Sequence, residues 1–462
     1  MISRYLIEPK IRPVLDAGFR PAVLARRAFE AEATVPVRLA LEQADGSVFR
    51  FTMRVLDVRH ENSAANGFFL ERYVKFLLWA FGGWRVWVDG PSGLAEELER
   101  HYRATAVGRF DSEIIGERIY DHPVKVEAAR DLPVARSTTA PLGRHLDGCR
   151  IGFDLGGSDR KVAAVKNGEV VYSEEVVWDP YFQKDPGYHH DGILDSLRRA
   201  AEHLPRVDAI GGSAAGVYVN NRVKVASLFR GVSKEDFEGR VKEMFLRLKE
   251  ECGGIPFEVV NDGEVTALAA SMSLGVNSVL GLSMGTSTAA GFVTADGGIT
   301  TWLNELAFAP VDYRVDGPKD EWSGDAGCGV QYFSQQAVGR LLGPAGIEVE
   351  AGLPLPEKLK VVQALMAAGD ERALRVYQTI GTYLGYAVGH WADFYEMDHL
   401  LILGRVTSGP GGDVILTGAR EVLREEFPEL AGRLRFHVPD EKEKRHGQAI
   451  AAASLPVIKT TP

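Results

Sequence analysis

Two turns rich in glycine and hydroxyl residues, each set between short apolar segments, constrain the fold of this chain more than any other feature. "DLGGSDRKVAAV" spans 154–165 and "LSMGTSTAAG" spans 282–291. In both, apolar residues lead into a turn of Gly, Ser or Thr and resume after it, which predicts a β-hairpin. Glycine lets the backbone approach a ligand closely, and successive backbone N–H groups in such a turn form a nest for an anion. The hairpins therefore predict two phosphate-binding loops.

Asp154 stands directly before the first turn. A carboxylate repels phosphate, so its place there makes sense if a Mg²⁺ ion lies between the two. An ordinary glycine hairpin with a solvated aspartate is the alternative for this stretch taken alone. The chain has neither the GxxxxGK[ST] motif of a P-loop nor a GxGxxG fingerprint. We therefore expect neither a P-loop nor a Rossmann nucleotide site.

The size and charge of the chain limit what it can be. A length of 462 residues predicts two or three domains, and 45% hydrophobic with 25% charged residues is typical of a soluble globular protein. The net charge of −10 argues against a nucleic-acid partner. Three cysteines without a CxxC pair suit a reducing compartment. No apolar run resembles a signal peptide or reaches the ~18 residues of a membrane span, so we expect a cytoplasmic protein with no membrane partner.

The first 148 residues have a different texture from the rest. Alternating apolar residues on either side of Asp45-Gly46 predict a hairpin over 35–56. A helical period follows over 67–83, then a short strand at 84–90 and a second helix at 91–102 with Ser92 as its cap. This pattern predicts a compact α+β domain, and the weakly periodic stretch 121–148 reads as a connector.

The stretch "FEVVNDGEVTALAA" at 257–270 places a polar pair between two expected elements. The apolar residues 257–260 predict a strand, and a helix is expected to start near Val265. A carboxylate at the end of a strand and beside a helix N-terminus points into a cleft, where Asp262 could act as a general base toward a hydroxyl. The alternative is that Asp262 or Gly263 only caps the helix.

Four stretches in this order resemble the ROK family of sugar kinases and sugar-responsive repressors, part of the actin/hexokinase/Hsp70 ATPase superfamily. They are the two hairpin motifs, "VVNDGEVTALAA", and "YLGYAVGHWADFYEMDHLLILGRVTSGPGG" at 383–412. The resemblance covers about 149–458. It implies an α/β fold with two ribonuclease-H-like lobes facing a cleft, behind an added N-terminal α+β domain. The expected division is 1–148, then 149–265 with a C-terminal helix 446–462 packing back, then 266–445.

The resemblance also implies roles for individual residues. Asp262 would be the general base, Asn261, Glu305 and Gly216 would contact the sugar, and Asp154 would organise Mg²⁺ through water. The residues expected to hold the ATP phosphates are Gly156, Gly157, Ser158, Gly285, Thr286 and Ser287. Those expected to hold adenosine, in a stretch that could instead be a plain strand-to-helix loop, are Gly404, Ser408, Gly409, Gly411 and Gly412.

The chain departs from the family around its zinc cluster. Phe308 stands where the zinc-binding histidine would be, and Glu321 and Ser323 replace two cysteines of the family's CxCGxxGCxExYxS motif. Cys328 is left as one thiol, which cannot make a four-ligand structural site, so no structural zinc is expected. Val330 replaces a further sugar-binding glutamate, which puts the identity of the sugar and catalysis itself in doubt.

The leading prediction is an ATP- and Mg²⁺-dependent kinase that phosphorylates a hydroxyl of a sugar or sugar-like polyol. Its partners would be that small molecule and ATP, with homo-oligomer formation left open. A non-catalytic sugar- or nucleotide-sensing protein of the same family is the alternative. The N-terminal region does not read as the helix-turn-helix of a repressor, and a role in dimerisation or as a lid stays open for it.

Overall fold

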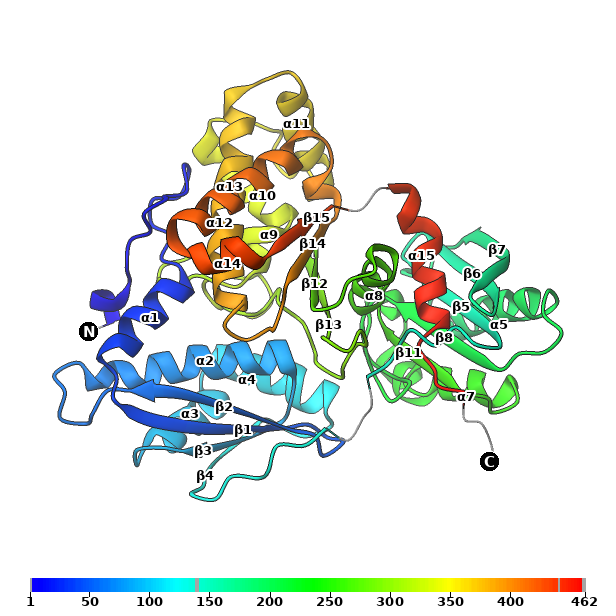
Figure 1. Cartoon of the computed structure of the whole chain (residues 1–462), viewed down its shortest axis with the longest axis horizontal. Helices are drawn as coiled ribbons and strands as arrows, with labels where there is room; N and C mark the ends of the chain where they lie inside the picture. Colours follow the sequence, from blue (N-terminus) through cyan, green and yellow to red (C-terminus); the bar gives the residue numbers. More distant parts are fainter. Residues whose placement is uncertain (1, 138–140, 439–440, 459–462) are drawn as a thin grey trace.

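The computed structural model describes residues 2–137, 141–438 and 441–458, and of 441–446 it describes the backbone alone. Three main β-sheets organise these residues (Figure 1). We refer to the N-terminal unit (2–137), the first lobe (149–261) and the second lobe (262–438). The division expected at 148 and 265 stays a prediction, because sheets alone do not test whether parts fold independently. Of the expected C-terminal helix 446–462, the helix of the structure ends at Ala453, residues 454–458 are not helical, and 459–462 lie outside the described residues.

The N-terminal unit packs helices on a four-stranded sheet of order β2-β1-β3-β4. β1 and β2 pair antiparallel from Val35↔Val55 to Glu42↔Val48, so the chain turns around Asp45-Gly46 as expected. In Figure 1, α2 lies across the sheet. The elements are η1 Ile2–Tyr5, α1 Ala22–Glu32, β1 Val35–Glu42, β2 Val48–Val55, η2 Ser63–Ala65, α2 Asn66–Phe81, β3 Arg85–Asp89, α3 Leu94–Ala104, α4 Ala106–Asp111, η3 Ser112–Ile119 and β4 Lys125–Ala128.

Two local expectations for this unit are wrong. Ser92 does not cap α3, because Gly93 precedes the helix with a φ of 91°, a left-handed conformation that glycine adopts without strain. The connector contains the strand β4, which pairs parallel to β3 from Arg85↔Lys125 to Val88↔Ala128. That strand is short and is held by a distant partner, so its own sequence carries little signal.

The first lobe has a five-stranded sheet of order β11-β8-β5-β6-β7. β5, β6 and β7 form an antiparallel meander, and β8 and β11 add parallel to β5 on its other side. The elements are β5 Cys149–Leu155, β6 Asp159–Lys166, β7 Glu169–Val177, α5 Pro186–Ala201, β8 Ala209–Ala214, β9 Val217–Val219, β10 Arg222–Val225, η4 Ser227–Phe229, α6 Lys234–Asp236, η5 Phe237–Val241, α7 Met244–Glu251 and β11 Phe257–Asn261.

The C-terminal helix α15 (Glu441–Ala453) returns to this sheet (Figure 1). Glycines in two neighbouring strands make room for it. A Cβ on Gly152 would lie 1.7 Å from the carbonyl oxygen of Ala449, and one on Gly211 would lie 1.7 Å from that of Ala452. The backbone of α15 therefore packs directly on β5 and β8, which no side chain larger than hydrogen would allow.

The second lobe has a four-stranded sheet of order β13-β12-β14-β15, which repeats the arrangement of β6, β5, β8 and β11 in the first lobe. β12 and β13 form the antiparallel hairpin, and β14 and β15 add in parallel. This two-lobed α/β arrangement with an extra N-terminal unit confirms the predicted fold class. The elements are α8 Asp262–Leu274, β12 Val279–Met284, β13 Thr288–Val293, α9 Val330–Phe333, α10 Gln335–Ala345, α11 Leu355–Ala367, α12 Glu371–Trp391, β14 His399–Leu403, η6 Arg405–Thr407, α13 Pro410–Glu426, α14 Pro428–Arg433 and β15 Arg435–His437.

The N-terminal unit and the second lobe share one continuous hydrophobic core. Trp79 of α2 stacks on Phe308 with 4.4 Å between ring centroids, and Phe81 contacts Trp302 edge-on at 4.7 Å. The first lobe has a core of its own. The N-terminal unit is therefore an extension of the second lobe in its packing.

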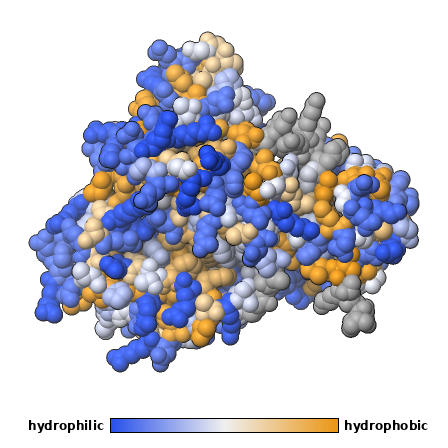
Figure 2. All heavy atoms as spheres, viewed as in Figure 1, coloured by the Kyte–Doolittle hydropathy of each residue, from blue (hydrophilic) through white to orange (hydrophobic). Residues whose placement is uncertain are grey.

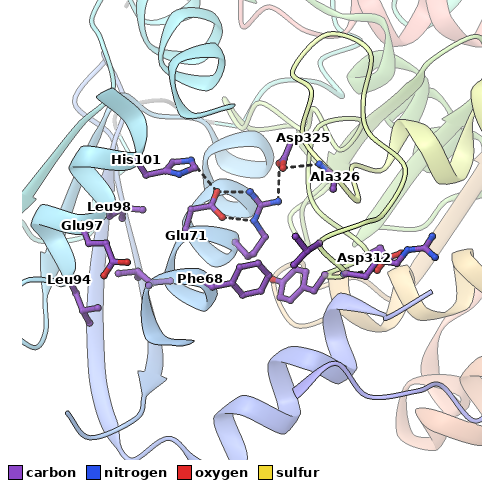
Figure 3. A pocket seen from close by; sticks show the side chains of 15 residues that line it. Phe68, Glu71, Leu94, Glu97, Leu98, His101, Asp312, Asp325 and Ala326 are labelled. Atoms are coloured by element: carbon purple, nitrogen blue, oxygen red, sulfur yellow. Dashed lines mark hydrogen bonds and ion pairs between the residues drawn. The ribbon is translucent and has the colours of Figure 1, made fainter. Parts of the chain in front are cut away.

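A buried ionic cluster joins the same two parts. Lys75 of α2 has no exposed surface, and its Nζ lies 2.9 Å from carboxylate oxygens of both Asp111 and Asp325. Arg72 donates to Asp325 at 2.9 Å and pairs with Glu71 (Figure 3). Burial opposes the charge on the Lys75 amine, but the two carboxylates outweigh it and raise the pKa of Lys75. The loop of the second lobe that carries Asp325 is thus joined to α2 through largely buried charges.

The outer surface is mixed in character. Figure 2 shows hydrophilic residues over much of the face seen in Figure 1, with hydrophobic residues scattered among them. Within the part of the chain that the structure describes, no helix is both long and apolar enough to cross a membrane.

Candidate active site

The first lobe gathers polar side chains at the carboxyl ends of its parallel strands. Asp154 on β5 pairs in register with Ser213 on β8, and Asn261 at the end of β11 pairs with Ala214. Ser213 donates its hydroxyl to Asp154 at 2.7 Å. Ligands of open α/β sheets bind at this edge, so β5, β8 and β11 together build the floor of a site.

Asp262 is the first residue of α8, where the two lobes meet. Its helix is capped by Asn261, whose side-chain oxygen accepts from the N–H of Gly263 at 2.7 Å. The cap is therefore in place without Asp262, although Asp262 Oδ1 also lies 3.0 Å from that N–H. The start of α8 is pressed against the second lobe, because a Cβ on Gly263 would lie 2.6 Å from the carbonyl oxygen of Ala290.

Burial, and after it the negative charge of Asp154, raise the pKa of Asp262 to about 6. Burial and the charge of Asp262 raise the pKa of Glu305 to about 7. The structure thus brings together three of the expected functional carboxylates, Asp154, Asp262 and Glu305. A carboxylate with a pKa near that of the surrounding solution is suited to accepting a proton from a hydroxyl.

Glu305 is positioned by the N-terminal unit. The N–H groups of Asn304 and Glu305 donate to the carbonyl oxygens of Ala80 and Trp79, at 2.8 and 2.9 Å. These carbonyls belong to the last turn of α2, where a helix has no partner of its own for them. The backbone at Glu305, the expected sugar-binding carboxylate, is therefore held by hydrogen bonds to the last turn of α2, a helix outside the two lobes.

Asn304 links this segment to both sides of the site. It is buried with a φ of 51°, donates its amide to Glu264 of α8, and accepts from the Tyr395 hydroxyl at 2.8 Å. Burial raises the pKa of Glu264 to about 8, against the opposing effect of the hydrogen bonds from Asn304 and Phe292 N–H. Neither Asn304 nor Glu264 is among the site residues expected from the sequence. A polar residue inside an otherwise apolar helix face is the signal that could have marked Glu264.

The first phosphate hairpin is a tight, internally bonded turn. The N–H of Gly156 donates to Asp159 O at 3.0 Å, and the indole of Trp178 donates to Gly156 O at 2.8 Å. A Cβ on Gly157 would lie 2.0 Å from the hydroxyl of Tyr181, so a larger residue here would displace that side chain. Ser158 directs its hydroxyl to Asp159 at 2.9 Å.

The second hairpin is more open. Gly285 has only Ser287 O, at 3.5 Å, near the position of a Cβ, and Thr286 and Ser287 are exposed. Beside the turn, the hydroxyl of Thr288 and both amide atoms of Gln335 are buried and have no hydrogen-bond partner in the described part of the chain. The N–H of Gln335 donates to Gly285 O at 2.9 Å. Unpartnered buried polar atoms beside an open glycine turn fit a site that is completed by a polar ligand such as phosphate.

The expected adenosine loop lines a cavity of about 510 Å³ between β14, η6 and α13. Four of the five expected residues are at its wall, Gly404, Ser408, Gly409 and Gly412. Gly411 instead faces the Tyr377 ring, where a Cβ would lie 2.4 Å from the ring. A Cβ on Gly404 would lie 2.5 Å from Met284 O, directly before the second phosphate hairpin, so the cavity and that hairpin are neighbours.

Gly216 lies under the end of β11. Its φ is 128°, a Cβ there would lie 2.5 Å from Val225 O, and its carbonyl accepts from the amide of Asn261 at 2.7 Å. The amide of Asn261 therefore has one N–H and one lone pair engaged inside the protein, and the second of each remains for a ligand.

The donor set at Asp154 fits Mg²⁺ held largely through water and phosphate. Mg²⁺ is usually bound by one or two carboxylates together with substrate phosphates and water, and Asp154 is the carboxylate at this edge. Lys161, opposite Asp154 in the β5–β6 register, has its Nζ 3.6 Å from Asp154 and 2.8 Å from Asp159. Lys161 is not among the residues expected from the sequence, although the alternation of β6 could have placed it on the same face of the sheet as Asp154.

The surroundings of Cys328 differ in kind from a metal site. In the described residues, no group of three or more His, Cys, Asp or Glu side chains is arranged to hold a metal ion. Cys328 is buried with Ala307 and Val330, and partly buried Phe308 packs against this cluster. Ser323 bonds to Asp320 within the same loop.

Two α/β lobes, each with a glycine-rich hairpin, and the carboxylate of Asp262 where they meet form the arrangement that the sequence motifs predicted. Comparison with known proteins identifies the fold. No family model matches the sequence, and no curated protein does.

Among solved structures, a ROK hexokinase from Thermus thermophilus matches 66% of this chain over 97% of its own length, at 18% identity and a TM-score of 0.50. A ROK-family transcriptional regulator, a homologue of the E. coli MLC protein, matches 67% of this chain over 79% of its own, at 20% identity and a TM-score of 0.50. The chain therefore has the ROK-family fold, as the sequence motifs predicted, with a further region outside it.

Proposed function

We propose that this protein is an ATP- and Mg²⁺-dependent kinase that phosphorylates a hydroxyl group of a sugar or sugar-like polyol. The observation that carries the proposal is the placement of Asp262. It lies at the junction of the lobes, beside Asp154 and Glu305, with a raised pKa, and Asn261 relieves it of the capping role. A carboxylate kept in such a place and not used by the fold is suited to a general base.

In the proposed reaction, Asn261 and Glu305 hold and orient the acceptor by hydrogen bonds to its hydroxyl groups. The carboxylate of Asp262 accepts the proton of the reacting hydroxyl as the oxygen of that hydroxyl attacks the γ-phosphorus of ATP. The bond between the γ-phosphorus and the β,γ-bridging oxygen breaks, and ADP leaves. The backbone N–H groups of Gly157, Ser158, Thr286 and Ser287 and the hydroxyls of Thr286 and Ser287 would bind the phosphates. The N–H groups of Gly156 and Gly285 and the hydroxyl of Ser158 instead donate within their own turns. Asp154 would hold Mg²⁺ through water, and the bound ion supplies positive charge to the transferring phosphoryl group.

A sensor without catalysis is the second candidate, and one observation favours it. Val330 stands where the resembled family has a sugar-binding glutamate, so one polar contact to the acceptor would be missing. The regulator among the fold relatives has the same TM-score as the hexokinase, so the fold alone does not separate the two.

A direct assay separates them. ADP release would be followed with ATP and Mg²⁺ over a panel of hexoses, amino sugars and polyols. A kinase gives acceptor-dependent ADP with at least one compound, whereas a sensor binds a compound without turnover.

Nucleotide binding is tested independently by thermal unfolding. ATP with Mg²⁺ should raise the melting temperature, because a ligand that binds only the folded state stabilises it by mass action. Asp154→Ala should reduce the Mg²⁺-dependent part of that rise. If neither ATP nor ADP moves the melting temperature at millimolar concentration, the nucleotide part of the proposal is refuted.

A further inference from the structure

A cavity of about 190 Å³ lies beside the candidate active site, between the N-terminal unit and the first lobe. Its walls come from three parts of the chain: Gln43, Asp45 and Tyr120 of the N-terminal unit, the β9–β10 hairpin with β11, and residues 299–303 of the second lobe. None of the N-terminal residues belongs to the region that has the ROK fold.

The cavity adjoins the catalytic centre directly. Asn261, which caps α8, and Glu264, in the first turn of α8, both line it, one on each side of Asp262 in the sequence. Tyr218 lies between the two spaces: it lines the cavity, and burial and the charge of Asp262 raise its pKa. On the opposite wall, the cavity reaches Leu303, two residues before Glu305.

The N-terminal unit holds that wall rigidly. The amide of Gln43 donates to Phe81 O at 2.7 Å and to Thr301 O at 3.0 Å, and accepts from the Thr301 hydroxyl at 3.0 Å. Trp302 stacks on Phe292 with 5.3 Å between centroids. The segment 299–305 is thus fixed between α2 and the second-lobe sheet, and its cavity face is set by the N-terminal unit.

We propose that this cavity is a second part of the substrate site, which receives a neutral or amine-bearing polyhydroxyl substituent on the sugar whose reacting hydroxyl gives its proton to Asp262. A second sugar ring is the class of substituent that fits. The inference rests on the proposed function, and it assigns the N-terminal unit to substrate selection.

Charge decides the class of substituent. The cavity lining includes Asp45, Glu258 and Glu264, and among these described lining residues there is no Lys, Arg or His. Burial raises the pKa of Glu258, and Glu264 has a pKa of about 8, so both favour the protonated form more than exposed carboxyls do. A carboxylate or phosphate on the ligand would meet no positive charge here, whereas hydroxyls and an amine would find acceptors.

Size and shape agree with a substituent. Pockets for whole ligands are typically about 300–1,000 Å³, so a cavity of about 190 Å³ suits one part of a ligand that continues into the active site. The aromatic side chains of Tyr218 and Trp302 offer apolar faces next to polar atoms, the mixture that amphipathic ring compounds need.

The test measures binding by calorimetry on the full chain, so that it does not depend on turnover. The ligands are a hexose that the protein binds and three glycosides of it, carrying a neutral sugar, an amino sugar or a uronic acid. The neutral and amino glycosides should bind at least tenfold tighter than the free hexose, and the uronic acid glycoside weaker than the neutral one. Equal or weaker binding of all three glycosides overturns the proposal.

Two variants sharpen the result. Asp45→Lys should reverse the order of the amino and uronic acid glycosides. Asp131→Lys makes the same charge change in an exposed segment outside the cavity lining and should keep the wild-type order. If both variants behave alike, the cavity does not select the substituent. Tight glycoside binding without any ADP release refutes the proposed function and leaves this inference standing; absence of binding by every sugar refutes both.

Discussion

Asp262→Asn replaces one carboxylate oxygen with an amide nitrogen. In this structure the change should remove only one function of the side chain, its ability to accept a proton. The cap of α8 is supplied by Asn261, so the helix start remains in place. The raised pKa of Asp262 means that the folded state binds the proton more tightly than the unfolded state does. Stability from this group is therefore full at low pH and decreases as the pH rises through about 6. Asparagine carries no charge, so above pH 6 the variant should melt at the same temperature as the wild type or higher.

The effect on catalysis should be large. Loss of a general base lowers the rate by about 10²- to 10⁴-fold, which is about 3–5 kcal/mol of transition-state stabilisation. In the wild type, a pKa of about 6 leaves about 90% of Asp262 ionised at pH 7 and about 10% at pH 5. The rate should therefore fall about tenfold between those values, with an acid limb that the variant lacks.

The assay is steady-state ADP release from pH 5 to 8 with the best acceptor from the panel, together with melting curves. Asp296→Asn, the same change in an exposed turn, serves as the control and should match the wild type in both measurements. Asp262 is not the base if Asp262→Asn keeps more than about half of the wild-type turnover. An unchanged acid limb in the variant would refute the assignment of that pKa to Asp262.

Three further predictions concern the buried charges and the zinc that the chain is expected not to bind. Lys75→Met should lower the free energy of unfolding by about 3–5 kcal/mol in denaturant titrations, because it leaves Asp111 buried without its cation and Asp325 with Arg72 alone; adding Asp111→Asn should recover part of the loss, and full stability of the single variant would contradict the argument. Glu264→Gln should raise the melting temperature relative to the wild type more at pH 9 than at pH 6, because the pKa of about 8 makes ionisation unfavourable in the folded state; an equal shift at both pH values would count against it. Elemental analysis should find zinc well below one atom per chain, and one tightly held zinc would overturn the loss inferred around Cys328.

The sequence predicts the parts of this structure that depend on neighbours along the chain. The hairpins around Asp45-Gly46, Gly156-Gly157 and Gly285 are local, because alternation and glycine turns fix them within a dozen residues. The strand before Asn261 and the helix after it were expected for the same reason, although the helix starts at Asp262, earlier than its apolar residues indicate.

The parts that the sequence could not predict depend on contacts between distant segments. The stacking of Trp79 on Phe308 and the hydrogen bonds from Asn304 to Ala80 leave no periodicity in either segment. The glycines within strands, such as Gly152, did not indicate from the sequence that the backbone of a helix packs on them. The local pattern of the N-terminal region therefore predicted a domain without indicating that its hydrophobic core continues into the second lobe.

The shared core has a consequence for synthesis of the protein on the ribosome. The hydrogen bond from Gln43 to Thr301 cannot form until Thr301, 258 residues further along the chain, has been synthesised. At about 5–20 residues per second, that interval is roughly 13–50 s. During this time the apolar face of α2, with Trp79 and Phe81, has no partner from the second lobe. The growing chain should therefore be a client of chaperones that shield nascent apolar surface, and slowing translation after α2 should increase its aggregation.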